Sequence, residues 1–172
     1  MDGWCLSIVL KEFLHIYASY VNASPITLEP VQPYGKYIKW LMEQDKEQAV
    51  SYWDHYLSGH EQQTVLPKQK KTKGRSRQEH VTFSFSKEES SRLSELAARE
   101  EVTLSTIFHT IWGILLQKYN NNDDAVFGSV ISGRPAEIEG IEHMVGLFIN
   151  TMPVRVQGAK TPFLQLIKDM QK

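Results

Sequence analysis

Residues 145–155 read Val-Gly-Leu-Phe-Ile-Asn-Thr-Met-Pro-Val-Arg, and the apolar pattern of their second half, from Met152 onward, predicts a β-strand. Residues 125–131 form an almost continuous apolar run bounded by turn residues, which is typical of a strand buried on both faces. After these strands, Thr161-Pro162 predicts the start of an amphipathic helix, with Thr161 as the N-cap and Pro162 as the first helical residue.

Two more helices are predicted before these strands. Ser86-Lys87-Glu88-Glu89 has the form of a capping box, in which the Ser hydroxyl and the Glu carboxylate bind free N–H groups at a helix start. This helix is expected to run to about Glu100. The next begins at Thr103 or Ser105 and ends in the turn-rich residues 120–124.

The first 59 residues are expected to contain only helices. Apolar residues from Leu6 to Tyr20 recur every three or four positions, which predicts a helix ending near Asn22. Three prolines then indicate an extended loop at about residues 23–33. Two aromatic-rich helices follow, and Ser58-Gly59 ends the second.

Residues 60–80 differ in composition, with six basic residues, two acidic residues and few apolar ones. They predict a solvated linker, with docking onto an acidic partner as the alternative. The predicted organisation is therefore a helical segment (1–59), a basic linker (60–80) and a segment of strands and helices (81–172) that opens with a half-buried strand at 81–85. The whole pattern predicts the α/β class.

The composition is that of an ordinary globular protein, with 172 residues, 41% hydrophobic and 23% charged. A net charge of −1 gives no reason to expect nucleic acid or an anionic membrane as a partner. Cys5 is the only cysteine, which excludes an internal disulfide and a cysteine-built zinc site. Without a visible secretion signal, the expected location is cytoplasmic.

The histidines give no independent catalytic signature. His15 and His109 lie on apolar helices and are interpreted as structural, and the other four are interpreted as peripheral. Neither His-Glu-x-x-His nor Gly-x-Ser-x-Gly occurs, and no metal site is predicted. Residues 128–133 have phosphate-loop glycine spacing, but Arg134-Pro135 replaces the required Lys-Ser/Thr.

Three segments, in this order, resemble the motifs of a nonribosomal peptide synthetase condensation domain. Asp2-Gly3-Trp4 is similar to the end of the signature His-His-x-x-x-Asp-Gly, whose histidines would lie immediately before residue 1. Ser132-Gly133-Arg134-Pro135 resembles a motif of the second lobe, and residues 146–155 resemble Gly-x-Phe-x-Asn-Thr followed by Arg. An aromatic block at residues 33–57 extends the resemblance over essentially the whole chain.

The resemblance implies an incomplete, two-lobed, chloramphenicol-acetyltransferase-like fold of the α/β class. Residues 1–59 would end the first lobe, 60–80 would be the linker, and 81–172 would begin the second lobe. The chain would be the central fragment of a domain that forms an amide bond between two carrier-tethered thioesters in antibiotic biosynthesis. The implied partners are donor and acceptor peptidyl carrier proteins, which bear 4′-phosphopantetheine, and adenylation domains of the same synthetase. The chain itself would bind no cofactor directly.

The resemblance also implies roles for individual residues. Asp2 and Gly3 would be the remnant of the catalytic motif. Asp2 would organise the motif through an arginine expected upstream, and Gly3 would admit substrate and offer its N–H to an oxyanion. Trp4 is interpreted as packing, as is Cys5, which stands where the family often has Ser. The substrate tunnel would be lined by Ser132, Gly133, Arg134 and Asn150.

Two alternatives remain open at this point. The chain would act as a noncatalytic module that binds carrier protein or other synthetase segments, or it would belong to an epimerisation-type relative of the family. Without the motif histidines, the isolated chain is expected to be inactive. The intact Asp2-Gly3 pair and the Ser132–Pro135 motif favour ordinary peptide condensation over epimerisation.

Limited proteolysis tests the predicted linker. We expect trypsin to cut first within residues 68–77, because this stretch is rich in Lys and Arg and poor in apolar anchors. A more resistant product should begin near Val81, as identified by N-terminal sequencing and mass spectrometry. A chain that melts in one cooperative transition and resists cleavage there would contradict the boundary.

Overall fold

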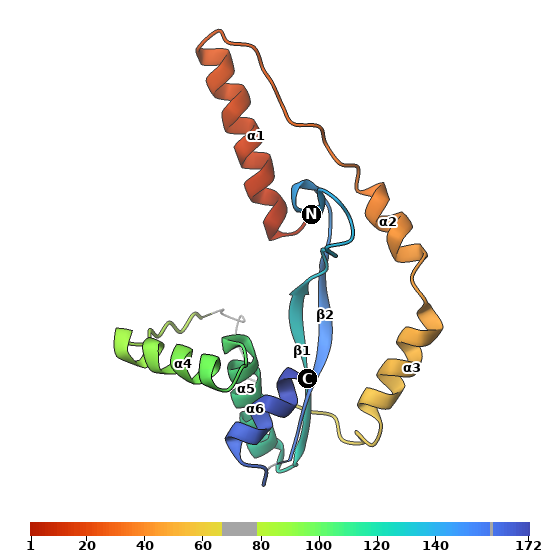
Figure 1. The fold of residues 1–172 in the computed structure, drawn as a ribbon, viewed down its shortest axis with the longest axis vertical. Helices are drawn as coiled ribbons and strands as arrows, with labels where there is room; N and C mark the ends of the chain where they lie inside the picture. Colours follow the sequence, from red (N-terminus) through yellow and green to blue (C-terminus); the bar gives the residue numbers. More distant parts are fainter. Residues whose placement is uncertain (67–78, 159) are drawn as a thin grey trace, which may run out of the picture. The chain divides into compact units, whose positions relative to one another are not determined.

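The computed structural model describes residues 1–66, 79–158 and 160–172, so most of the predicted basic linker lies outside the described residues. Figure 1 shows the order of the helices and strands along this part of the chain. They belong to two compact units. The first consists of Met1–Tyr56 and Ser129–Met152, and the second consists of Leu57–Gly128 and Pro153–Lys172. Each unit has its own hydrophobic cluster.

In the first unit, helix α1 (Gly3–Val21) begins after Asp2 and ends at Asn22, as the apolar pattern predicted. Asp2 is the N-cap, and its carboxylate accepts a hydrogen bond from the backbone N–H of Cys5. Only Cys5 and Ser19 of this helix are buried. Large apolar side chains are exposed along it, among them Leu6, Phe13, Leu14, Tyr17 and Tyr20.

The remainder of the first unit is built around aromatic side chains. Helices α2 (Gly35–Met42) and α3 (Lys46–Leu57) lie where aromatic-rich helices were predicted. The buried cluster consists of Ile141, Met144 and Phe148, with Tyr34, Tyr37 and Ile138 packed against it. The short 3-10 helix η1 (Ile141–His143) supplies one side of this cluster.

In the second unit, three helices enclose the other cluster. These are α4 (Lys87–Arg99), α5 (Leu104–Asn120) and α6 (Phe163–Gln171). Their buried residues are Ala97, Val102, Ile107 and Ile167. The capping box is confirmed, because Ser86 and Glu89 exchange side-chain to backbone hydrogen bonds, and Thr103 caps α5.

Strands β1 (Asp124–Ser132) and β2 (Ile149–Gln157) form a two-stranded sheet. Backbone hydrogen bonds flank the pair, from Gly133 N–H to the Phe148 carbonyl and from Gly158 N–H to the Asp123 carbonyl, so the strands run antiparallel. Each unit contains one end of the pair. In the second unit, Gly113 of α5 faces Val156 of β2, where a glycine Cβ would lie 2.2 Å from a Val156 methyl group.

Three local predictions were wrong. Residues 81–85 form no strand in the described structure, and Val81 is 91% exposed, because alternation alone does not supply a hydrogen-bonding neighbour. Strand β1 is not buried on both faces, since Val130 is 65% exposed and no described layer covers the two-stranded sheet there. Helix α6 has Pro162 as its N-cap, without a side-chain cap bond, rather than Thr161.

No helix in the described parts of the chain is both long and apolar enough to cross a membrane.

The close contact at Gly113 makes a stability prediction. We expect Gly113→Ala to lower the free energy of unfolding by about 1–3 kcal/mol, because the branched Val156 side chain cannot move aside without disturbing β2. Urea denaturation of the purified chain measures this. The control is Gly35→Ala at the start of α2, where no atom lies within 4 Å of the added Cβ. Equal stability of the two variants would contradict the packing argument.

Candidate functional site

The carboxylate of Asp2 is the centre of a hydrogen-bonded site in the first unit. Its Oδ2 accepts a bond from the backbone N–H of Phe148 at 3.0 Å. Its Oδ1 accepts from the backbone N–H and the thiol of Cys5, at 3.3 and 3.2 Å. The guanidinium of Arg134 lies 3.8 Å from Oδ1. Three segments distant in the sequence therefore meet at one carboxylate.

This environment keeps Asp2 ionised. Burial by itself raises the pKa of a carboxyl group, and the Asp2 side chain is only 5% exposed. The hydrogen bonds from Phe148 and Cys5, with the positive charge of Arg134, outweigh burial and lower the pKa of Asp2 to about 2. A negative charge at neutral pH makes Asp2 a positioning group and a poor proton donor.

Arg134 is held on several sides. Its side chain is 7% exposed and donates hydrogen bonds to the carbonyls of Ile141 and Met144. The guanidinium carbon lies 3.8 Å from the ring centroid of Phe148 and 5.7 Å from that of Trp4. The expectation of an upstream arginine partner for Asp2 is corrected by this contact, because Arg134 of the same chain occupies that role.

Trp4 also has a polar contact. Its indole N–H donates to the carbonyl of Glu142 at 3.0 Å, so it does more than pack.

Glycines allow the backbone segments of the site to approach one another. A Cβ at Gly133 would lie 2.2 Å from the Phe148 carbonyl oxygen, and one at Gly146 would lie 2.1 Å from the Tyr34 ring. Tyr34 in turn donates from its hydroxyl to the Leu147 carbonyl at 2.7 Å. Gly3 differs, because no described atom lies within 4 Å of the position of its missing Cβ.

The structure brings together some of the sequence-predicted residues and leaves others apart. Asp2 and Arg134 are in direct contact, and Gly133 joins them through Phe148. Ser132 and Asn150 lie exposed at ends of β1 and β2. The side chain of Asn150 accepts a bond from the adjacent N–H of Thr151. The groups that bind the Asp2 carboxylate are supplied by Cys5, Arg134 and Phe148 instead.

A cavity of about 240 Å³ lies elsewhere in the first unit. It is lined by one face of α1, including Glu12 and His15, by residues 27–31 and by His143. None of the predicted tunnel residues lines it. His15 is an exposed cavity residue and was wrongly interpreted as a structural one.

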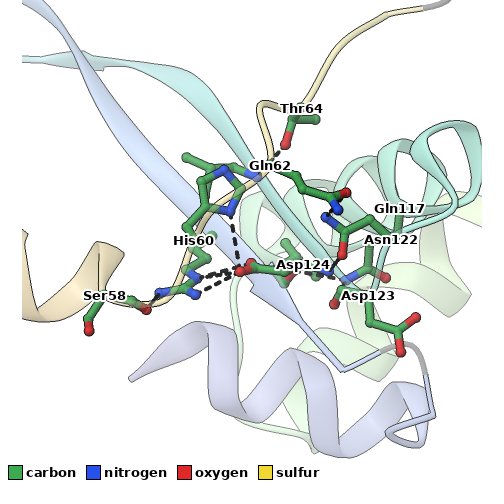
Figure 2. Close-up of polar contacts among 11 residues, drawn as sticks. Ser58, His60, Gln62, Thr64, Gln117, Asn122, Asp123 and Asp124 are labelled. Carbon is green, nitrogen blue, oxygen red and sulfur yellow. Dashed lines mark hydrogen bonds and ion pairs between the residues drawn. The ribbon is translucent and has the colours of Figure 1, made fainter.

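A second polar centre lies in the second unit, around Asp124 (Figure 2). Arg155 donates to both carboxylate oxygens, at 3.0 Å from Nε and 2.7 Å from Nη2, and also to the Ser58 carbonyl. Nδ1 of His60 lies 3.2 Å from the Asp124 carboxylate. Sequence reasoning missed this centre by taking His60 as peripheral. The Arg155 of the Asn-Thr motif was the available signal.

The Asp124 centre holds the start of the predicted linker. Thr64 accepts a bond from the N–H of Val126, and Asn120 bonds both the N–H and the carbonyl of Val65. Gln62 accepts from Asn122 (Figure 2). Residues 60–65 are therefore attached to the second unit by side-chain hydrogen bonds.

These two centres contain the residues that carried the sequence motifs, and comparison with known proteins identifies the family. The family model described as the condensation domain matches residues 1–172. The chain belongs to the condensation-domain family.

Relatives of this condensation-domain chain are large synthetases. It is 99% identical, over all of its 172 residues, to a plipastatin synthase protein of Bacillus subtilis (strain 168), and covers 5% of that protein. It is 46% identical to gramicidin S synthase 2 of Brevibacillus brevis, covering 4% of it. The chain thus spans only a small share of the curated relatives that it matches.

Solved structures agree on the fold. The X-domain from teicoplanin biosynthesis matches 99% of this chain with a TM-score of 0.79 and 22% identity, and the chain covers 40% of it. The first condensation domain of the calcium-dependent antibiotic synthetase matches with a TM-score of 0.70 and 13% identity, again with 40% covered. The predicted chloramphenicol-acetyltransferase-like condensation fold, present in part, is confirmed.

In the described residues of this condensation-domain chain, no group of three or more His, Cys, Asp or Glu is placed to hold a metal ion.

The Asp124 centre predicts a specific acid sensitivity. Burial raises the pKa of Asp124, but the hydrogen bonds and charge of Arg155, with the bond from His60, lower it below the ordinary value of 3.8. Because the folded pKa is the lower one, the stabilisation is present at neutral pH and is lost as pH falls below about 4. Asp124→Asn should lower the free energy of unfolding at pH 7 by about 3 kcal/mol.

Urea denaturation at a series of pH values measures this. The difference between the unmodified chain and Asp124→Asn should shrink as pH falls below about 4. Asp54→Asn, an exposed change on α3, is the control and should follow the unmodified chain. A difference that is independent of pH would show that the charge of Asp124 contributes nothing.

Proposed function

We propose that this chain is the central segment of a synthetase condensation domain, which joins two carrier-tethered aminoacyl or peptidyl thioesters through an amide bond. The observation that supports this most strongly is the convergence of three motif segments on the Asp2 carboxylate. The Asp-Gly segment, the Ser-Gly-Arg-Pro segment at Arg134 and the Gly-x-Phe segment at Phe148 make one bonded site. A set of motifs kept only for packing has no need of a buried, ionised carboxylate.

In this proposal Asp2 positions the turn on which the motif histidines are carried. The amine of the acceptor attacks the donor thioester carbonyl, the thiol of the donor carrier leaves, and the amine loses a proton. A positioned histidine base contributes about 10²–10⁴-fold to such a step. Gly3 lies beside open space at the first residue of α1, where its N–H can face the oxyanion that forms on the carbonyl.

The four proposed tunnel residues divide into two pairs. Gly133 and Arg134 are engaged with the Phe148 segment, so their proposed task is to shape the tunnel wall. Ser132 and Asn150 are exposed on the strands, where their polar side chains can orient a thioester or the pantetheine arm.

The proposed partners are the donor and acceptor peptidyl carrier proteins and the adenylation domains of the same synthetase. The 4′-phosphopantetheine belongs to the carrier proteins, and this chain binds no cofactor of its own in the proposal. The proposed location is the cytoplasm. The proposed lobe boundaries remain 1–59, 60–80 and 81–172.

A noncatalytic binding role is the second candidate. The apolar side chains exposed along α1 favour it, because a helix that is apolar on most sides normally packs against other protein. In the leading proposal the same surface packs within the longer synthetase. The two candidates differ in whether that synthetase loses amide formation when the Asp2 site is changed.

Reconstitution with both carrier-bound substrates tests the catalytic proposal. The isolated chain should give no amide above a no-enzyme control, and the longer synthetase that contains this segment should give product, measured by mass spectrometry. Asp2→Ala in the longer protein should lower the rate by about 10²-fold, because the motif turn loses its fixed position. It should also reduce thermal stability.

The matched control is Asp54→Ala, which removes an exposed carboxylate on α3. Its rate and melting temperature should equal those of the unmodified protein. Amide formation by the isolated chain, or an unchanged rate and stability in Asp2→Ala, would overturn the proposed role of Asp2.

A further inference from the structure

Cys5 lies in the first turn of α1 and is completely buried. Its sulfur is 3.2 Å from Oδ1 of Asp2 and 3.0 Å from the carbonyl oxygen of Gly146. The backbone N–H of Gly146 donates to the sulfur at 3.2 Å, and Nη2 of Arg134 lies 3.6 Å from it. The thiol is therefore surrounded by polar groups of three segments.

This arrangement exceeds what packing requires. A thiol has one hydrogen, which it donates either to the Asp2 carboxylate or to the Gly146 carbonyl, while its sulfur accepts from N–H groups. A polar group without a partner is costly in a site that excludes water, so these contacts restrain the backbone on both sides. Asp2 itself also donates from its N–H to the Gly146 carbonyl, at 3.3 Å. The sulfur thus joins the Asp2 turn to Gly146.

We propose that Cys5 is a positioning residue for the condensation reaction, because its thiol fixes the Asp2 turn against the Gly146 backbone. The inference rests on the proposed function and deepens it. Cys5 forms no bond with substrate. It acts through Asp2, by holding the carboxylate in the orientation that also receives the Phe148 N–H. A side chain with a hydroxyl can take over this task, and one without a polar atom cannot.

The experiment uses the longer synthetase that contains this segment, with both carrier proteins loaded. Cys5→Ala should lower the kcat of amide formation about 10-fold and leave the KM for the acceptor carrier unchanged. Cys5→Ser should stay within about 2-fold of the unmodified enzyme, because its hydroxyl both donates and accepts. Ser19→Ala, at the other buried residue of α1, is the control and should leave kcat unchanged.

A double-mutant cycle separates positioning from packing. If Cys5 acts through Asp2, Cys5→Ala should have almost no further effect on kcat in an Asp2→Asn enzyme. A residue that only fills space would lower the rate or stability by the same factor in both backgrounds. If Cys5→Ala reduces the folded fraction, Cys5→Val replaces it in the cycle, since it fills the site without a hydrogen-bonding group.

The outcomes are distinguishable. Equal kcat for Cys5→Ala and the unmodified enzyme, equal losses in Cys5→Ser and Cys5→Ala, or additive effects in the cycle would each overturn the role of Cys5. None of these results bears on whether the domain forms amides. Failure of the unmodified synthetase to form an amide, with both carriers shown to be loaded, would instead overturn the proposed function.

Discussion

The burial of an ionised carboxylate at Asp2 is the constraint on which the first unit depends. A charge that is removed from water must be matched by hydrogen bonds or an opposite charge. Asp2 obtains these from Cys5, Arg134 and Phe148, of which the last two lie far from it in the sequence. The start of α1 and the segment between the two strands must therefore meet, and the glycines that permit close approach lie at that meeting point.

The second unit solves the same problem with different residues. The Asp124 carboxylate binds Arg155 of β2 and His60, and neighbouring side-chain bonds attach residues 60–65 to the end of β1. Both centres pair an aspartate with a largely buried arginine, whose planar guanidinium makes several bonds at once. Each arginine was visible in a sequence motif, but its partner was not.

Membership in the condensation-domain family gives these centres a common interpretation. In the proposed mechanism, chemistry is supplied by groups outside this chain, and the chain's own residues set position, shape and charge. This division fits the low pKa of Asp2, which suits a permanent anion better than a proton donor. It also places Cys5 among the groups that determine rate without touching substrate.

The sequence by itself determined the helices and their ends, because the signals are local. Apolar residues three and four positions apart, the Ser86 capping box and the Gly59 terminator act within one or two helical turns. It also carried the family motifs. Only the tertiary structure decided that Arg134 pairs with Asp2, that His60 reaches Asp124 and that residues 81–85 remain unpaired. These outcomes depend on contacts between distant segments, and no local pattern specifies which distant partner a strand, a histidine or a carboxylate will find.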